Sequence, residues 1–371
     1  MSRVREAMIV AGGAGTRLRP LTATTPKPLL PFCGAPFLEG VVRRLAAIDV
    51  ERVLLVVGAD TGPFERFVSD MRARGVDVAT VPEPVPLDTA GGVRAALDQI
   101  SGTFLVLNGD ILTDVDLAAA VAAHHAARAG ATLVLTRVPD TSTFGVCVRE
   151  GTRIVAFVEK PAPGTLPGQD AINAGTYVLE PDVLGRFPIG RLSFERQVFP
   201  ELVSAGVHVE GWVGDGAWAD LGTPQRYLDG HRLALDGALV WPALDDVPPD
   251  ANGIRAGGDV EVAADALVRG PVLLLPGARV GSGAVVGPHA VVGQAVTIAR
   301  GARIVDSVLG PQTAVGDNAL VQGVITGVAA NVQADVQMLD GAVLGDGVVV
   351  AAGTHVPAGA RIPHVPDAGM V

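Results

Sequence analysis

The sequence predicts an α/β domain with a mostly parallel sheet, followed by a left-handed parallel β-helix. Up to about residue 236, short β-branched runs alternate with helical stretches, as at 53–57, 104–107, 132–138 and 154–158. Such alternation is typical of a parallel sheet covered by helices, with ligands at the carboxyl ends of the strands. From position 260 to 362, every sixth residue is apolar except Thr326. Hexads with one inward small or aliphatic residue indicate the β-helix.

These patterns set the expected domain boundaries. We expect the α/β domain to span residues 1–236, a linker at 237–256, where prolines and acidic residues change the texture, and the β-helix to span 257–371. The hexads run on without an inserted loop and amount to about six coils of three strands. A rod of this kind has flat sides, which favours association with a second copy. We therefore expect a homo-oligomer that assembles through the β-helix.

Composition excludes several classes of protein. The 371 residues are 49% hydrophobic, enough for two cores, and carry a formal net charge of −11 without a basic run. That balance excludes nucleic acid and anionic membranes as partners. We expect a cytoplasmic protein, because the N-terminal apolar run is too short for a signal peptide and no run of eighteen apolar residues occurs. Cys33 and Cys147 are predicted to be free thiols, and no Cys/His pattern of a metal centre is present.

A glycine-rich segment predicts a loop that binds a polyphosphate. The apolar run at 7–11 is typical of a buried strand, and Gly12, Gly13 and Gly15 follow it. Glycines that leave a strand let backbone N–H groups approach phosphates. Arg17 and Lys27 add two cations, while prolines at 20, 26 and 28 prevent one long helix. The segment has neither the Gly-Lys-Ser/Thr ending of a P-loop nor the third glycine of a dinucleotide-binding turn.

The same segment, Gly-Gly-Ala-Gly-Thr-Arg-Leu-Arg-Pro-Leu-Thr followed by Pro-Lys-Pro at 26–28, resembles the signature of the sugar-1-phosphate nucleotidyltransferases. The resemblance covers nearly the whole chain and is closest to mannose-1-phosphate guanylyltransferases (GDP-mannose pyrophosphorylases) that carry a C-terminal left-handed β-helix. It implies a Rossmann-like nucleotidyltransferase domain with a mixed, mostly parallel sheet. It also implies attack by a sugar-1-phosphate oxygen on the α-phosphorus of a nucleoside triphosphate, giving a nucleotide sugar and pyrophosphate without a covalent intermediate.

Two carboxylates at strand ends match the family and predict a Mg²⁺ site. Asp110 ends the strand-like run at 105–110, and Asp220 precedes a helix opened by Thr223 and Pro224. Each alone could simply cap the following helix. The resemblance places them together, and Mg²⁺ takes one or two protein carboxylates with phosphate oxygens and water.

Further segments match the family's sugar-binding residues. The resemblance implies that Lys160 holds the sugar phosphate, that Glu159 and Asn173 bind sugar hydroxyls, and that the backbone of Gly145 approaches the sugar. We interpret the segment at 193–200, which also matches, chiefly as a structural flank of the sugar pocket.

These matches give a full set of expected roles. Arg17 and Lys27 neutralise the triphosphate and the leaving pyrophosphate, Mg²⁺ bridges the α-phosphate and the incoming phosphate, and Lys160 aligns the nucleophile. The expected catalytic residues are Arg17, Lys27, Asp110, Lys160 and Asp220. The expected nucleotide-binding residues are Ala11, Gly12, Gly13, Gly15, Thr16, Arg17, Glu83, Asp88, Thr89, Asn108 and Asp110.

One departure from the family bears on the base. Relatives usually show Pro-Leu-Gly-Thr-Ala-Gly, whereas this chain has Asp88 in place of the first glycine. Glu83 and Asp88 as acceptors would suit the adjacent N1–H and N2–H donors of guanine, which favours GTP over UTP and dTTP. In the alternative interpretation, Asp88 faces solvent or caps the helix that begins near Thr89.

Other functions stay open. Glucose-1-phosphate, a heptose phosphate or a phosphorylated cyclitol could replace mannose-1-phosphate. The family also contains non-catalytic regulatory paralogues, and many hexapeptide-repeat proteins are acyltransferases that use a histidine base, for which His289, His355 and His364 are candidates. We expect the remaining histidines, His124, His125, His208 and His231, at the surface without a function.

Overall fold

The computed structural model describes residues 3–138, 140–141, 144–159, 161–162 and 170–364. The chain divides into two compact units. The first unit comprises Met1–Gly13 and Val41–Trp218, and the second comprises Ala14–Gly40 and Ala219–Val371. The glycine-rich segment is thus shared, because its first glycines belong to the first unit and Gly15, Arg17 and Lys27 to the second.

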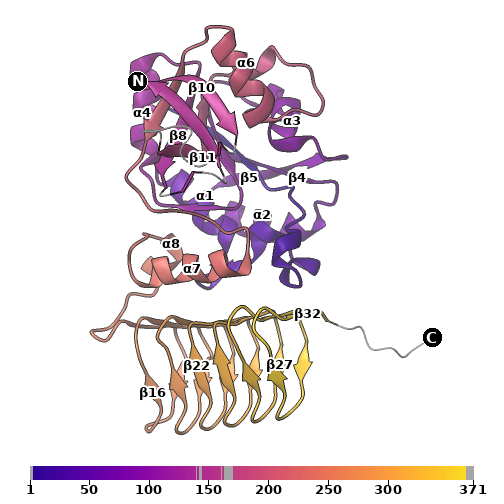
Figure 1. Ribbon diagram of the computed structural model, residues 1–371, viewed down its shortest axis with the longest axis vertical. Coiled ribbons are helices and arrows are strands. Elements are labelled where there is room, and N and C mark those ends of the chain that lie inside the picture. Colours follow the sequence, from indigo (N-terminus) through magenta and orange to yellow (C-terminus); the bar gives the residue numbers. More distant parts are fainter. Residues whose placement is uncertain (1–2, 139, 142–143, 160, 163–169, 365–371) are drawn as a thin grey trace, which may run out of the picture. The chain divides into compact units, whose positions relative to one another are not determined.

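A mixed nine-stranded sheet forms the centre of the first unit, in the order β5-β4-β1-β6-β11-β8-β12-β10-β9 (Figure 1). Its strands are β1 (Glu6–Val10), β4 (Arg52–Gly58), β5 (Asp77–Glu83), β6 (Phe104–Asn108), β8 (Ala131–Arg137), β9 (Gly145–Glu150), β10 (Arg153–Glu159), β11 (Ala171–Leu179) and β12 (Val209–Val213). The first four run parallel, and β11 runs antiparallel to β6 and β8. The predicted mixed sheet is confirmed, but it is not mostly parallel: β11 pairs antiparallel with β6, β8 and β9, and β10 pairs antiparallel with β9 and β12.

Helices and short turns connect these strands. They are α1 (Phe37–Ala46, shared by the two units), α2 (Glu65–Ala73), α3 (Asp88–Ala95), α4 (Leu117–Ala127), α5 (Pro181–Gly185), α6 (Phe199–Ser204), the π-helical turn η6 (Phe194–Val198), the 3₁₀ turns η4 (Gly62–Phe64) and η5 (Leu97–Gln99), and the short strand β7 (Ile111–Thr113). The buried run at 53–57 lies in β4, at the centre of the parallel half. Asp116 caps α4 by accepting a hydrogen bond from the Ala119 N–H at 2.9 Å.

The β-helix of the second unit stacks three parallel sheets of two- and three-residue strands (Figure 1). One sheet contains β14 (Ile254–Ala256), β17 (Val272–Leu274), β20 (Ala290–Val292), β23 (Val308–Leu309), β26 (Ile325–Thr326), β29 (Val343–Leu344) and β32 (Arg361–Ile362). The second contains β15 (Glu261–Val262), β18 (Arg279–Val280), β21 (Thr297–Ile298), β24 (Ala314–Val315), β27 (Asn331–Val332) and β30 (Val349–Val350). The third contains β16 (Leu267–Val268), β19 (Val285–Val286), β22 (Arg303–Val305), β25 (Leu320–Gln322), β28 (Gln337–Met338) and β31 (His355–Val356).

The predicted regular run of hexads is wrong at two places, where a step of the repeat is one residue shorter. Val272 pairs with Ala290, eighteen residues further on, whereas Val291 pairs with Val308, only seventeen further on. The spacing returns to eighteen where Ile325 pairs with Val343. We call the two five-residue steps, 305–309 and 322–326, the shortened steps; they stack on each other, because Val308 pairs with Ile325.

Buried hydroxyls satisfy the backbone at the shortened steps. Ser307 Oγ donates to the Val305 carbonyl at 2.7 Å and accepts from the Val324 N–H at 3.1 Å. Thr326 Oγ1 accepts from the Gly310 N–H at 2.9 Å and lies 2.9 Å from Thr313 Oγ1. Polar side chains therefore enter this otherwise apolar interior at the places where the repeat is one residue shorter.

The remaining elements of the second unit include a group of aromatic side chains around Phe32. They are η1 (Thr16–Leu18), η2 (Leu21–Ala23), η3 (Lys27–Leu29), β2 (Pro31–Phe32), β3 (Ala35–Pro36), α7 (Pro224–Leu235) and α8 (Pro242–Asp245), with β13 (Trp218–Asp220) entering from the first unit. The ring of Phe32 contacts those of Phe37, Tyr227 and Trp241 edge-on. Trp241 is buried although it lies in the segment predicted as a linker.

His231 of α7 is also part of this core, which corrects its expected place at the surface. Its side chain is 2% exposed, with Nε2 accepting from the Cys33 N–H at 3.2 Å and Nδ1 donating to the Tyr227 carbonyl at 2.8 Å. Burial lowers the pKa of His231 to about 4, against a smaller opposing effect of the Tyr227 carbonyl.

Within the described residues, no helix has both the length and the apolar character needed to cross a membrane.

Candidate functional site

The first unit collects predicted nucleotide-binding residues at the carboxyl edge of its parallel strands. Val10 of β1 is level with Val56 of β4 and with Asn108 of β6. The next residue, Ala11, donates its N–H to the Val56 carbonyl at 2.7 Å, and Gly109 donates to the Val10 carbonyl at 2.8 Å. A side chain at position 109 would collide with that carbonyl, so the turn that carries Asp110 requires glycine. Gly12 and Gly13 are exposed beside this turn.

Glu83 ends β5 at the same edge, level with Gly58 of β4. The residue is 8% exposed, and its Oε1 has no hydrogen-bond partner among the described residues. Burial raises the pKa of Glu83, with a smaller opposing effect of the Gly92 N–H. A Cβ at Gly92 would lie 2.2 Å from Oε1, and one at Gly12 would lie 3.1 Å from Oε2. Glycines on two segments therefore make room for this buried acceptor.

Asp88 opens α3 in a conformation that explains the glycine of relatives. Its φ of +69° lies in the left-handed region, which glycine adopts without steric cost. Its Oδ1 accepts from the Thr89 N–H at 3.0 Å, and its Oδ2 lies 2.9 Å from Arg196 Nη2 and 3.6 Å from Arg191 Nε. The carboxylate thus binds two arginines from a segment about a hundred residues away, a pairing that the local sequence gives no signal for.

Thr89 and Asn173 are tied to one hydrogen-bonded chain that passes through Glu195. Thr89 Oγ1 donates to Glu195 Oε2 at 2.8 Å, and Tyr177 Oη donates to Glu195 Oε1 at 3.3 Å. Asn173 Nδ2 donates in turn to Tyr177 Oη at 2.9 Å, while its Oδ1 accepts from the Gly175 N–H at 3.0 Å. Glu195, interpreted from sequence as structural, thereby links the predicted nucleotide side to the predicted sugar side.

The sheet also brings the predicted sugar segments together. Gly145 begins β9 and pairs with Glu159 at the end of β10. The next residue of β9, Val146, pairs with Ile172 of β11, which places Asn173 beside this end of β9. A Cβ at Gly175 would lie 2.7 Å from Asn108 Nδ2, so the sugar segment reaches the end of β6. Lys160 lies outside the described residues.

The second unit gathers predicted phosphate-binding cations around Asp220. Lys27 Nζ lies 3.9 Å from Asp220 Oδ1, and Arg226 Nη1 donates to Asp220 Oδ2 at 2.7 Å. A Cβ at Gly222 would lie 2.6 Å from Asp220 Oδ1 and 2.9 Å from Arg17 Nη2, so Arg17 adjoins the same carboxylate. Sequence reasoning missed Arg226, whose only signal is its place in the first turn of α7, the helix that Thr223 caps.

The loop that carries Arg17 has a defined shape. Gly15 lies in the left-handed region with φ +58° and caps η1, in which Thr16 and Arg17 lie. Its carbonyl accepts from Thr22 Oγ1 at 2.9 Å, and a Cβ at Gly15 would lie 3.1 Å from the Cβ of Lys27. The close approach requires glycine and holds the Lys27 backbone next to the start of η1.

Asp220 fits the role of a metal ligand. Its Oδ1 is buried and accepts no hydrogen bond in the part of the chain that the structure describes. A lone pair of this oxygen is therefore available to a metal ion. A carboxylate oxygen is the ligand that Mg²⁺ prefers. Asp110, the second predicted ligand, follows β6 in the first unit and is described with that unit alone.

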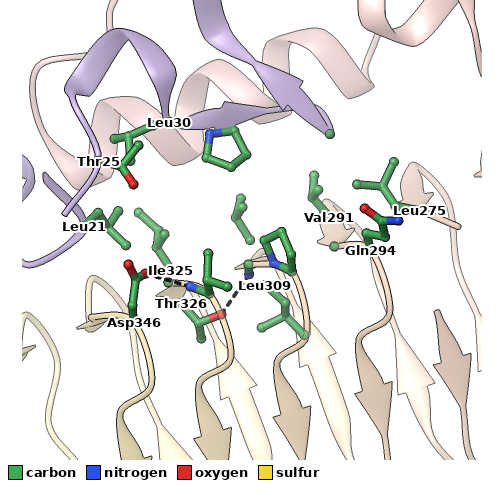
Figure 2. Close-up of a pocket in the computed structure, with 18 of the residues that line it drawn as sticks. Leu21, Thr25, Leu30, Leu275, Val291, Gln294, Leu309, Ile325, Thr326 and Asp346 are labelled. Atoms are coloured by element: carbon green, nitrogen blue, oxygen red, sulfur yellow. Dashed lines mark hydrogen bonds between the residues drawn. The ribbon is translucent and has the colours of Figure 1, made fainter. Parts of the chain in front are cut away.

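An apolar cavity of about 130 Å³ lies elsewhere in the second unit. Figure 2 shows Leu21 and Leu30 above Leu309 and Ile325 of the β-helix. Asp346 is the one charged side chain among the described lining residues. A lining of this kind does not suit a triphosphate, so we do not assign the substrates to it.

His289, considered above as a base for an acyltransferase, contacts Asp236: its Nε2 lies 2.8 Å from Asp236 Oδ1.

Comparisons with known proteins show the family of the chain. A family model described as nucleotidyl transferase matches residues 6–237, and one described as GMPPB C-terminal domain matches residues 268–365. A mannose-1-phosphate guanylyltransferase of Mycobacterium tuberculosis is 40% identical over 74% of this chain and 75% of its own length. A mannose-1-phosphate guanyltransferase of Hypocrea jecorina is 32% identical over 96% of this chain and 95% of its own length. The structure of HddC from Yersinia pseudotuberculosis complexed with GMP-PN is 25% identical, with a TM-score of 0.53 over 61% of this chain and 98% of that one.

Proposed function

The chain belongs to the nucleotidyl transferase family, and from this premise we propose that it makes GDP-mannose and pyrophosphate from GTP and mannose-1-phosphate. One observation carries the proposal: glycines follow the end of β1, and Arg17 and Lys27 come next in the chain. Free backbone N–H groups together with two cations suit a triphosphate. The choice of substrates follows the names of the relatives from Mycobacterium tuberculosis and Hypocrea jecorina.

In this proposal the reaction is one in-line displacement. A phosphate oxygen of the sugar-1-phosphate attacks the α-phosphorus of GTP, the bond from that phosphorus to the bridging oxygen breaks, and pyrophosphate leaves with the bond's electrons. Arg17 and Lys27 neutralise the charge that develops on the leaving group. Lys160 aligns the attacking phosphate, while Glu159, Asn173 and the backbone of Gly145 hold the sugar.

We propose Asp110 and Asp220 as the ligands of a Mg²⁺ ion. The support from the structure is the buried Oδ1 of Asp220, which accepts no hydrogen bond among the described residues and lies 3.9 Å from Lys27 Nζ. A bound Mg²⁺ would supply charge stabilisation to the phosphate oxygens during transfer. Lys27 and Arg226 flank Asp220, with Lys27 Nζ 3.9 Å from Oδ1 and Arg226 Nη1 2.7 Å from Oδ2.

We propose that Glu83 meets the guanine base. Its buried Oε1 lacks a donor among the described residues, and guanine offers N1–H and N2–H side by side. Ala11, Gly12, Gly13, Gly15, Thr16, Thr89 and Asn108 complete the proposed nucleotide-binding set. Asp88 is included in this set as well, although its carboxylate must turn from Arg196 and Arg191 to reach the base.

The organisation of the protein is proposed on the same basis. We infer a catalytic domain at 1–236, a linker at 237–256 and a β-helix domain at 257–371, in a cytoplasmic homo-oligomer that assembles through the β-helix. That domain exposes single apolar side chains at Val262, Leu267 and Val349, and we propose that side chains of this kind contact the second copy. Light scattering on the full chain tests it, and a monomer at micromolar concentration contradicts it.

One assay tests the proposed reaction. Pyrophosphate release is measured over a grid of GTP, ATP, UTP and dTTP against mannose-1-phosphate, glucose-1-phosphate, a heptose phosphate and a phosphorylated cyclitol. We expect the highest kcat/KM for GTP with mannose-1-phosphate. A higher value for another pair reassigns the substrates. Absence of turnover with every pair favours a regulatory paralogue, and turnover of acetyl-CoA favours an acyltransferase.

A further inference from the structure

A second group of ligating side chains lies at the opposite edge of the sheet of the first unit. His124 and His125 occupy the last turn of α4, and Glu180 directly follows β11. Because β11 runs antiparallel to β6, Glu180 lies at the start of β6, beside Thr103. The five residues of β6, at about 3.3 Å each, separate this group by roughly 16 Å from Asn108 at the substrate edge.

The three side chains converge on one point. His124 Nε2 lies 3.2 Å from Glu180 Oε1, and the rings of His124 and His125 have centroids 5.4 Å apart. One nitrogen of each histidine and one Glu180 oxygen all lie within 4.8 Å of one another. Small side-chain rotations bring three such atoms to the distances of about 2.0–2.2 Å at which Zn²⁺ binds nitrogen and oxygen.

Neighbouring groups already fix these ligands. Thr132 Oγ1 lies 2.8 Å from His124 Nδ1, which leaves Nε2 directed at Glu180. Thr103 Oγ1 donates to Glu180 Oε1 at 2.8 Å, and the Glu180 N–H donates to the Gly130 carbonyl at 3.0 Å. Outer hydrogen bonds of this kind orient the ligands of natural zinc sites.

His124 presents a ring nitrogen to Glu180 inside the fold. The residue is 1% exposed, and its Nε2 lies 3.2 Å from Glu180 Oε1. Without a metal ion, Nε2–H can donate to the Glu180 carboxylate while Nδ1 accepts from the Thr132 hydroxyl. A metal ion would take the place of the Nε2 proton, because ligands release protons when a metal binds. The expected surface location of His124 is therefore wrong, and the juxtaposition of these residues was not visible in sequence.

We propose that His124, His125 and Glu180 bind one divalent transition-metal ion of the Zn²⁺ class. Two imidazole nitrogens and one carboxylate oxygen suit Zn²⁺, whereas Mg²⁺ takes oxygen ligands. Water completes the coordination. The ion joins the C-terminal end of α4 to the end of β11 and stabilises the fold, and it is separate from the Mg²⁺ of the proposed reaction.

Calorimetric titration of the untagged full-length protein with Zn²⁺ tests the proposal. The protein is first treated with a chelator, and excess Mg²⁺ is then present throughout to occupy the oxygen-rich substrate site. We expect one equivalent of Zn²⁺ to bind and to raise the melting temperature, because a ligand that binds only the folded state stabilises it. Binding of no Zn²⁺ under these conditions overturns the proposal.

Variants locate the ion. His125→Gln and Glu180→Gln change partly exposed side chains and should each weaken Zn²⁺ binding at least tenfold, the loss expected even for an outer partner of a ligand. His208→Gln is the matched control, because it removes the other close histidine–glutamate contact, His208 Nε2 to Glu210 Oε2 at 2.9 Å. Unchanged affinity in both ligand variants, or equal loss in the control, contradicts the site. Turnover with Mg²⁺ should stay at the native level in all three variants, whether or not the proposed substrates are right.

Discussion

The sheet of the first unit and the β-helix of the second unit place their polar groups differently. In the sheet, the strands are apolar along their length, and Glu83, Asn108 and Asn173 lie at or near strand ends. In the β-helix, the interior is closed by aliphatic residues, and the buried hydroxyls of Ser307, Thr313 and Thr326 gather at the shortened steps. Polar chemistry therefore enters each region where regular pairing ends.

The difference lies in what the polar groups are left to do. Within the β-helix the hydroxyls are satisfied by one another and by the backbone. At the sheet edge Glu83 Oε1 accepts no hydrogen bond among the described residues, and neither does Asp220 Oδ1 of the second unit, which lies 3.9 Å from Lys27 Nζ. A satisfied group stabilises the fold, whereas an unsatisfied buried acceptor is available to a ligand. The comparison assigns binding to the strand ends and support to the repeats.

The largest expected effect comes from the proposed metal ligands. Replacing Asp110 or Asp220 by Asn preserves shape but removes the charge, and should lower turnover about a hundredfold or more. Mg²⁺-dependent pyrophosphate release measures this, with the fold checked by circular dichroism. Asp346→Asn, a carboxylate on the β-helix, is the control and should keep native turnover. Near-native rates in a well-folded Asp110→Asn or Asp220→Asn protein would remove that residue from the site.

The buried histidine of α7 predicts a pH dependence of stability. The pKa of His231 is lowered to about 4 in the folded state from an ordinary 6.5, so the unfolded chain binds the extra proton between these values. Stability is therefore fully present above pH 6.5 and falls as the pH drops toward 4, by about 2 kcal/mol at pH 5 and roughly 3 kcal/mol at pH 4. Urea denaturation at pH 7 and pH 5 measures it.

A variant isolates the contribution of His231. His231→Gln cannot take up the proton, so its stability should change less between pH 7 and pH 5, by about 2 kcal/mol. Equal pH dependence in native protein and His231→Gln would show that this histidine stays neutral in both states or is accessible in the fold.

Much of the fold was predictable because its signals are local. Each strand end that carries a candidate residue is an apolar run followed by a glycine or an acid, as at Gly12 and Asp110. The β-helix has a fixed period. The shortened steps escaped detection because Val308, Ala314 and Leu320 are apolar, although after the first slip they lie between the inward positions. After the second slip, the count of every sixth residue falls on the other inward position of each hexad, as at Val332.

The missed features depend on contacts between distant segments. Asp88 and Arg196 are 108 residues apart, and Cys33 and His231 are 198 apart. His124, near the end of the alanine-rich α4, and His231, within the polar α7, give no local sign of burial, so the sequence predicts both at the surface. The expected nucleotide and sugar residues could be named from motifs, but the chain through Tyr177 and Glu195 that connects them depends on the fold.

Asp88 tests whether the strand ends also select the base. If Asp88 and Glu83 both face the base, Asp88→Gly should lower the preference for GTP over UTP and dTTP by about five- to 150-fold, equivalent to roughly 1–3 kcal/mol. The kcat/KM values for GTP, ATP, UTP and dTTP in native protein and variant measure it. Glycine suits the φ of +69°, so the fold should be preserved. An unchanged ratio would assign Asp88 to holding Arg196 and Arg191, and a native preference for UTP or dTTP would refute the guanine proposal.

The smallest expected effect concerns the interior of the β-helix. Thr326→Val keeps the shape of the side chain but removes its hydroxyl. In this variant the Gly310 N–H still donates to the carbonyl of residue 326 at 3.1 Å, and Thr313 Oγ1 still donates to the Gly327 carbonyl at 3.3 Å. Because both partners keep an acceptor, the free energy of unfolding should fall by only about 1 kcal/mol. Chemical denaturation measures it, and Thr297→Val, at an exposed position of the same domain, should change it by less than about 0.5 kcal/mol. A loss above about 3 kcal/mol would mean that these hydroxyls determine the conformation of the shortened steps. Single polar groups would then be as important in the β-helix as they are at the edge of the sheet.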